Sequence, residues 1–197
     1  PYTAIDFGLL RTADTYNNDD QRIMEINLVT PGLSFIVPAY NEEKGVIETL
    51  TRLDKTLSSL GLPYEIILVN DGSSDNTATL AQTCTNVKTI SHPINTGYGS
   101  AIKTGVQLAN YAWIGITDAD GSYPIEDIPK LVEQMRKGFD MVVAARSNLN
   151  TFDSWRKSFF RWIFKYMIKL TVRGDVKDVN SGLRVFRKSL ATFFMPF

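Results

Sequence analysis

Two aspartates separated by one residue, Asp118 and Asp120, follow the apolar run from Tyr111 to Ile116. The run predicts a buried strand, and paired carboxylates at the carboxyl end of such a strand can hold a hard cation against a diphosphate. Mg²⁺ and Mn²⁺ both take carboxylate and phosphate oxygens as ligands. A solvated turn is the alternative, because Asp and Gly are common in turns. Further motifs must decide between these two interpretations.

A second acidic motif, Asn70–Asp75, also stands between a predicted strand and a predicted helix. In a parallel sheet it would lie at the same edge as the Asp118 pair. Asp71 could accept hydrogen bonds from a nucleobase or from ribose hydroxyls. Ser74 or Asp75 could instead cap the following helix, and the two roles are compatible.

A glycine-rich loop begins with Gly97 and Gly99, and Lys103 and Thr104 fit the end of a P-loop motif. Both that motif and G-x-G-x-x-G require glycine where this chain has Ile102, which argues against both. The helix start at Gly97 and Gly99, followed by Lys103, remains a candidate cofactor-binding position. The first N–H groups of a helix have no partner within the helix and can bind an anion.

Composition excludes several other classes of protein. Among 197 residues, Lys+Arg and Asp+Glu are 21 each, and zero net charge argues against a general nucleic-acid binder. Cys84 is the single cysteine and His92 the single histidine, which excludes an internal disulfide and argues against a multi-cysteine or histidine-based metal site. No run of 18 uncharged apolar residues occurs, so no segment of this chain is expected to span a bilayer.

Apolar runs alternate with helical patterns along the chain. The predicted strands are 33–39, 64–69, 87–90, 111–116, 140–145 and 183–186, with a weak edge strand at 22–29. The predicted helices are 42–60, 78–84, 100–110, 125–137 and 152–172, the first with Asn41 as its N-cap. This order predicts an α/β fold with a mostly parallel sheet, helices on both faces and a single domain.

Four motifs occur together in the chain: Val37–Glu43, Val69–Thr77, Asn95–Ala101 and Asp118–Gly121. In this order they resemble family 2 glycosyltransferases of GT-A fold, most closely the dolichyl-phosphate mannose synthase-like, or polyprenyl-phosphate glycosyltransferase, branch. The resemblance covers about residues 33–190. It implies a GT-A domain over 32–190, a partly irregular extension over 1–31, and a C-terminal continuation opening at 191–197.

The resemblance also implies an activity and residue roles. The activity is metal-dependent, inverting transfer of a sugar from a UDP- or GDP-linked donor to a polyprenyl or dolichyl phosphate. The nucleotide would be lined by Pro38, Ala39, Tyr40, Glu42, Asp71 and Ala119. Asp118 and Asp120 would bind Mg²⁺ or Mn²⁺ and the donor diphosphate. Catalysis would use these two together with Arg146, Asp178 and Arg184.

Two positions depart from the family pattern. Residues 178–184 resemble the acidic Ser-Gly-Phe-Arg segment near the acceptor phosphate, but Leu183 replaces the usual Phe. Ser122 stands where many dolichyl-phosphate mannose synthases carry a glutamine that is a further metal ligand. The third metal ligand and the identity of the sugar therefore stay open, as do the nucleobase and the oligomeric state.

Residues 155–170 carry a pattern that predicts a helix with two distinct sides. The basic side is Lys157, Arg161, Lys165 and Lys169, and the apolar side is Trp155, Phe159, Trp162, Ile163, Tyr166 and Leu170. Such a helix can lie in a membrane interface, or it can be a core helix with a solvated basic face. The family resemblance favours the membrane. We expect a protein at the cytoplasmic face of a membrane, peripheral or anchored by segments beyond this chain.

Two alternative functions remain. A family 2 enzyme could use a hydroxyl acceptor such as a glycan, which would need a carboxylate base, whereas a phosphate oxygen is already anionic. A non-catalytic membrane-surface module could also keep the same fold. The intact Asp71, Asp118 and Asp120 argue against that module.

Overall fold

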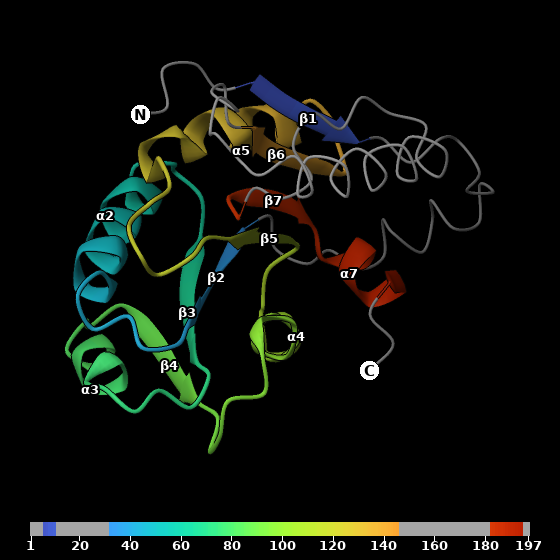
Figure 1. The fold of residues 1–197 in the computed structure, drawn as a ribbon. Coiled ribbons are helices and arrows are strands. Elements are labelled where there is room, and N and C mark those ends of the chain that lie inside the picture. The colour runs from blue at the N-terminus through green and yellow to red at the C-terminus, as the bar shows by residue number, and fades with distance from the viewer. Residues whose placement is uncertain (1–5, 11–31, 146–181, 195–197) are drawn as a thin grey trace, which may run out of the picture.

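The structure is a computed structural model that describes residues 6–10, 32–145 and 182–194 (Figure 1). Its strands are β1 (Asp6–Leu10), β2 (Leu33–Ala39), β3 (Tyr64–Asn70), β4 (Val87–Ser91), β5 (Trp113–Ile116), β6 (Met141–Ala145) and β7 (Arg184–Arg187). Its helices are α2 (Val46–Ser58), α3 (Thr77–Gln82), α4 (Tyr98–Leu108), α5 (Ile128–Arg136) and α7 (Lys188–Phe194). A short 3₁₀ turn, η1 (Ile125–Asp127), precedes α5.

The strands form one seven-stranded sheet in the order β1-β6-β7-β5-β2-β3-β4. β2 pairs in parallel with β3 and β5, and β3 pairs in parallel with β4. β7 is antiparallel to β5 and to β6, and β1 is antiparallel to β6. Five strands, β2 to β6, therefore run in one direction, which confirms the predicted mostly parallel sheet.

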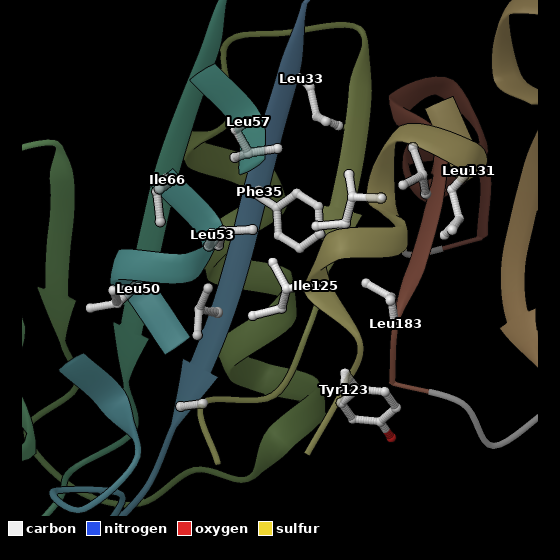
Figure 2. Packing of buried hydrophobic residues seen from close by; sticks show 14 of the residues in the cluster. Leu33, Phe35, Leu50, Leu53, Leu57, Ile66, Tyr123, Ile125, Leu131 and Leu183 are labelled. Carbon is white, nitrogen blue, oxygen red and sulfur yellow. The ribbon is translucent and has the colours of Figure 1, made fainter. Parts of the chain in front are cut away.

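Both faces of the sheet are covered by helices, as the alternation predicted. Helices α2, α3 and α5 cover one face, and α4 and α7 cover the other (Figure 1). Phe35 and Val37 of β2 join the core beneath α2 and α5, whereas Ile36 points to the α4 side. Figure 2 shows Phe35 between Leu53 of α2 and Ile125 of η1. Burial on both faces explains why these strands read as continuous apolar runs.

The loops that follow β2, β3 and β5 leave the sheet at one edge, because these neighbouring strands are parallel. A fourth loop, residues 92–97, lies against Gly72 so closely that a Cβ there would collide with the backbone of Ile94 and Asn95. Gly72 also has φ of +71°, which favours glycine. Four loops far apart in sequence therefore meet at the carboxyl edge of the sheet.

The predicted N-cap at Asn41 is wrong. Helix α2 begins at Val46, and its N-cap is Gly45 without a side-chain hydrogen bond. Asn41 has φ of +57°, and its Oδ1 accepts a hydrogen bond from the Ser74 N–H at 2.9 Å. The side chain that was expected to cap a helix therefore joins two loops.

Several predictions lie outside the described residues: the edge strand at 22–29, the helix at 152–172 with the 155–170 segment, Arg146 and Asp178. Strand β1, which the sequence did not predict, falls within the expected extension and forms the sheet edge beside β6. Within 6–10, 32–145 and 182–194, no helix is both long enough and apolar enough to cross a bilayer.

Candidate active site

An open cleft of about 320 Å³ lies at the carboxyl edge of the sheet. It is lined by Pro38, Ala39, Tyr40, Glu42, Asp71, Asn95, Tyr98, Ala101, Asp118, Ala119 and Asp120. These residues come from the ends of β2, β3 and β5, the 92–97 loop after β4 and the start of α4. The structure thus brings the predicted nucleotide-pocket and metal residues around one cavity.

Four other predicted residues do not line this cleft. Gly97 is the N-cap of α4, Gly99 lies in its first turn, and Lys103 lies one turn further on. Arg184 begins β7 beside β5. Conversely, Asn95, Tyr98 and Ala101 line the cleft although they were not among the predicted site residues. All three belong to the Asn95–Ala101 motif, which pointed to this loop.

Asp71 is buried at the base of the cleft and organises the loop opposite. Its Oδ1 accepts hydrogen bonds from the His92 Nδ1–H at 2.7 Å, the Thr96 N–H at 3.0 Å and the Thr96 hydroxyl at 2.8 Å. Its Oδ2 accepts the Gly97 N–H at 2.7 Å. Burial alone would raise the pKa of Asp71, but these donors together lower it to about 2. The carboxylate is therefore ionised and fixes the 92–97 loop.

His92 links this carboxylate to helix α4. Because an ionised carboxylate only accepts, Nδ1 carries the proton, and Nε2 lies 3.0 Å from the Thr104 hydroxyl. Thr104 resembled the last residue of a P-loop in sequence, yet its hydroxyl contacts His92. The position of His92 between Asp71 and Thr104 was not predicted from the sequence.

Hydrogen bonds between loops join two of the four motifs, Val37–Glu43 and Val69–Thr77. The Asn41 N–H donates to the Ser73 hydroxyl at 2.9 Å, and the Glu42 N–H donates to the Thr77 hydroxyl at 2.8 Å. Asp75 accepts the Glu43 N–H and also the Thr77 N–H of the first helical turn of α3. Backbone and short polar side chains thus hold these loops together, and the carboxylate of Glu42 faces the cleft.

Three further carboxylates, those of Glu42, Asp118 and Asp120, concentrate negative charge in the cleft. Burial raises the pKa of Glu42, and repulsion from Asp120 and Asp118 adds to the effect. Burial likewise raises the pKa of Asp118, with further repulsion from Asp120. A cation in the cleft would favour the ionised forms of Glu42 and Asp118.

Two tyrosine hydroxyls donate to Asp118. The Tyr98 hydroxyl, from the first turn of α4, lies 3.0 Å from Asp118 Oδ1. Partial burial and the charge of Asp118 raise the pKa of Tyr98, so the phenol keeps the proton that it donates. The Tyr123 hydroxyl lowers the pKa of Asp118 through hydrogen bonding, and its oxygen accepts the Gly182 N–H at 2.8 Å. Asp118 is therefore a fixed, ionisable group held between α4 and the strand β7 region.

The loop that carries Asp118 and Asp120 is held from behind by α2. The Thr49 hydroxyl donates to the Ala119 carbonyl at 3.0 Å. Arg52 makes a two-pronged contact with Glu126, at 2.8 and 2.9 Å, and reaches the carbonyls of Gly121 and Tyr123. Helix α2 thus fixes the backbone of this loop and leaves the Asp120 side chain exposed in the cleft.

The donor set fits a divalent cation that is held only partly by protein. Among the residues that the structure describes, no three acidic, histidine or cysteine side chains converge as metal ligands. Ser122, at the position of the doubtful third ligand, donates its backbone N–H to Asp120 Oδ1 at 2.9 Å. A cation at Asp118 and Asp120 would need further oxygens from a ligand, as Mg²⁺ commonly does.

Arg184 provides positive charge near the acidic pair. Its charge lowers the pKa of Asp118 and of Tyr98, so it lies within electrostatic reach of the cleft. Its Nε is buried, and within the described part of the chain it has no hydrogen-bond partner. A buried guanidinium nitrogen without a partner is costly unless an anion satisfies it, so Arg184 is suited to an anionic ligand.

Comparisons with known proteins agree with this geometry. The family model for glycosyl transferase family 2 matches residues 34–193. An undecaprenyl-phosphate 4-deoxy-4-formamido-L-arabinose transferase from Proteus mirabilis is 36% identical over 164 residues, which cover 80% of this chain and 49% of that protein. The chain thus spans about half the length of this relative.

Solved structures show the same fold at low sequence identity. A glucosyl-3-phosphoglycerate synthase from Mycobacterium tuberculosis, in complex with Mn²⁺, UDP-glucose and phosphoglyceric acid, has a TM-score of 0.64 at 18% identity, covering 93% of this chain and 65% of that one. A mannosyl-3-phosphoglycerate synthase from Rubrobacter xylanophilus has a TM-score of 0.65 at 16% identity, covering 86% and 56%.

Proposed function

This chain belongs to glycosyltransferase family 2, and from that membership we propose that it moves a sugar from a UDP- or GDP-linked donor to a polyprenyl phosphate, with Mg²⁺ or Mn²⁺ as cofactor. The observation that carries the proposal is the single cleft in which Asp71, Asp118 and Asp120 meet. The name of the Proteus relative specifies undecaprenyl phosphate, which supports the acceptor. The Mn²⁺ and UDP-glucose in the mycobacterial synthase support the donor class.

The donor nucleotide is proposed to lie between the β2 and β3 loops. Tyr40 is 48% exposed at the rim and offers an aromatic face, while Pro38 and Ala39 form the floor. Asp71 Oδ1 already accepts three hydrogen bonds, whereas Oδ2 accepts one. Oδ2 is therefore the oxygen with capacity left for an N–H of the base or a ribose hydroxyl.

The donor diphosphate is proposed to reach Asp118 and Asp120. A bound Mg²⁺ or Mn²⁺ would neutralise negative charge on the leaving diphosphate. The chain's own residues fix the geometry: Tyr98 and Tyr123 orient the Asp118 carboxylate, and the Ser122 N–H orients Asp120. Such preorganisation lowers the barrier because no reorientation is needed during the reaction.

The acceptor phosphate is proposed to approach from the Arg184 side. Arg184 has a buried nitrogen suited to an anion, and the family resemblance implies that Arg146 and Asp178 also take part in catalysis. A phosphate oxygen is anionic at neutral pH and can attack the anomeric carbon without a general base. Displacement from the opposite face inverts that carbon. A polyprenyl chain resides in a membrane, so the reaction is proposed to occur at a membrane surface.

Nucleotide titration and a transfer assay test this proposal. We expect UDP or GDP to bind in the presence of Mn²⁺, and one of a panel of UDP- and GDP-sugars to give transfer to undecaprenyl phosphate in detergent. Asp120→Ala should lower Mn²⁺-dependent nucleotide binding at least about a hundredfold and abolish transfer, since it removes an exposed candidate ligand. Glu133→Ala, an exposed acid on α5, is the matched control and should behave as wild type.

Three outcomes would contradict the proposal. Absence of nucleotide binding to the folded wild type would favour the non-catalytic module. Transfer to a glycan hydroxyl but not to the lipid phosphate would favour the hydroxyl-acceptor alternative. Transfer by Asp120→Ala at the wild-type rate would remove that residue from the site.

A further inference from the structure

Tyr123 joins two parts of the site that are far apart in sequence. Its side chain is 8% exposed and packs in the main core, at the end that faces the carboxyl ends of the strands, beside Leu183 (Figure 2). Its oxygen accepts the Gly182 N–H at 2.8 Å, Asp118 Oδ2 lies against the same glycine, and hydrogen bonding from the Tyr123 hydroxyl lowers the pKa of Asp118. One buried phenol therefore touches the acidic pair and the segment that leads to Arg184.

The fit between these groups is close. A Cβ on Gly182 would lie 2.8 Å from Asp118 Oδ2 and 2.8 Å from the Tyr123 hydroxyl oxygen, both of which are shorter than normal contacts. A phenol has one proton to donate and lone pairs with which to accept. The Gly182 N–H approaches a lone pair of this oxygen, and the direction of that lone pair changes when the phenol O–H rotates.

Tyr98 offers an internal comparison. It also donates to Asp118, at 3.0 Å, but it comes from α4 and is 46% exposed. Its hydroxyl bonds Asp118, and among the described residues it makes no hydrogen bond to residues 182–187. The two tyrosines thus share one role, orienting Asp118, and differ in whether they contact Gly182.

We propose that Tyr123 is a positioning residue that couples occupancy of the donor site at Asp118 to the placement of residues 182–184 on the acceptor side. A ligand that turns the Asp118 carboxylate must also turn the Tyr123 hydroxyl, which holds the backbone two residues before Arg184. The inference rests on the proposed function, because it takes Asp118 as part of the donor site and Arg184 as part of the acceptor site. Coupling of this kind is reciprocal: a change at Gly182 must also alter binding at Asp118.

Three variants separate this coupling from a general structural role. Tyr123→Phe keeps the ring in the core and removes both hydrogen bonds, Tyr98→Phe removes only a donor to Asp118, and Gly182→Ala perturbs the link from the other end. Nucleotide affinity is measured by calorimetry with Mn²⁺ and UDP or GDP. Amide hydrogen exchange of residues 182–187 is measured with and without the same ligands.

We expect both phenylalanine variants to weaken Mn²⁺·nucleotide binding by about three- to tenfold, the usual net effect of losing one hydrogen bond. Without ligand, Tyr123→Phe should speed exchange of the Gly182 amide at least about tenfold, and Tyr98→Phe should leave it unchanged. Ligand should slow exchange over 182–187 in wild type and Tyr98→Phe but not in Tyr123→Phe. Gly182→Ala should weaken nucleotide binding although residue 182 does not line the cleft.

These measurements distinguish failure of the proposed function from failure of the coupling alone. If the wild type binds no nucleotide, the proposed function is overturned and the coupling with it. If nucleotide binds normally but Tyr123→Phe shows wild-type protection of residues 182–187, only the coupling is overturned. Wild-type nucleotide affinity in a folded Gly182→Ala variant would also overturn it.

Discussion

Four carboxylates line the cleft, and they differ in how their charge is balanced. Asp71 accepts four hydrogen bonds and is stabilised in its ionised form. Glu42 and Asp118 have raised pKa values because burial and neighbouring acids disfavour their charge. Asp71 stabilises the fold, whereas Glu42 and Asp118 favour binding of a cation. This contrast separates a group that shapes the cleft from groups available to a cation.

Asp71 should make the free energy of unfolding depend on pH between about pH 4 and pH 2. Its folded pKa of about 2 lies below the ordinary aspartate value of 3.8, so ionisation favours the folded state. The contribution is complete above the unfolded value and is lost as pH falls through the folded value. For Asp71→Asn we expect a loss of about 1–2 kcal/mol at pH 7, allowing for the solvent-filled cleft beside the carboxylate. The loss should shrink between about pH 4 and pH 2.

Urea unfolding of wild type and variant across this pH range is the measurement. Asp120→Asn is the control, because it removes an exposed carboxylate that repels Glu42 and Asp118, and it should change stability by less than about 0.5 kcal/mol or raise it. If Asp71→Asn lowers the free energy of unfolding by the same amount at pH 7 and at pH 3, the site requires the shape of this side chain and not its charge.

Motif spacing predicted the residues that meet in the cleft, because each predicted carboxylate follows a strand and parallel strands end together. It did not predict the hydrogen-bond partners. His92 bonds Asp71 across 21 residues, and Gly182 bonds Tyr123 across 59. Such contacts are set by how loops pack, and a single sequence carries no local signal for them. The Tyr98 contact with Asp118 was missed for the same reason.

At the scale of elements, the strands were easier to predict than the start of the first helix. β2 and β3 are buried on both faces, so their apolar runs marked them clearly. Helix α2 was placed from Glu42 but begins at Val46, because the Glu42 N–H bonds Thr77 at the start of α3 and the Glu43 N–H bonds Asp75 just before it. Tertiary hydrogen bonds here replace the first helical turn.

The sheet order was only partly predictable. The alternation of strands and helices predicted the parallel β2, β3, β4 and β5 arrangement. Nothing in the short run before Phe186 showed that β7 would lie antiparallel between β5 and β6. Strand β1 was missed because its partner, β6, follows more than a hundred residues later, and local periodicity does not report such pairing.

Arg52 should be the principal link between α2 and the loop that carries the acidic pair. Its side chain is 28% exposed, and it bonds Glu126 in two places as well as two loop carbonyls. We expect Arg52→Ala to lower the free energy of unfolding by about 1–2 kcal/mol. Mn²⁺·nucleotide affinity should fall about threefold or more, because the loop backbone loses support. Arg52→Lys should lose nearly as much, since lysine cannot reproduce the planar fork.

Urea unfolding and nucleotide titration measure the two effects. Arg136→Ala is the matched control, because this arginine of α5 makes a single exposed contact with the Leu60 carbonyl at 3.4 Å. It should cost less than about 0.5 kcal/mol and leave nucleotide binding unchanged. Arg52→Lys with full wild-type stability and affinity would show that a positive charge alone is sufficient.

At the scale of the whole molecule, the faces of the sheet and its carboxyl edge have different roles. The helices on both faces bury the strands, and the carboxyl edge is left for loops that carry the cleft. The proposed acceptor is a lipid, so a membrane-facing element is required beside this edge. The basic and aromatic pattern of residues 155–170 is the candidate that the sequence provides. Because these residues lie outside the described part, their role is a proposal from sequence spacing alone.

The membrane proposal predicts a salt-dependent attachment. Each basic residue near an anionic bilayer contributes about 1 kcal/mol, so four could strengthen binding roughly a thousandfold at low salt. The test changes four residues to glutamine: Lys157, Arg161, Lys165 and Lys169. We expect this variant to leave anionic liposomes and to lose transfer to polyprenyl phosphate in liposomes, while it binds nucleotide as wild type does. The matched control changes four exposed lysines elsewhere, Lys55, Lys88, Lys130 and Lys137, and so alters net charge equally.

Co-sedimentation with anionic liposomes at low and high salt, beside nucleotide titration, separates the outcomes. Release of the first variant but not of the control would locate the attachment in residues 155–170, because the two variants carry the same net charge. Equal release of both would mean that overall charge, not this segment, holds the protein to the membrane. Full co-sedimentation of the first variant at low salt would favour a core helix with a solvated basic face. The polyprenyl-phosphate acceptor would then depend on Arg184 and on the relative's substrate, without a membrane-binding helix in this chain.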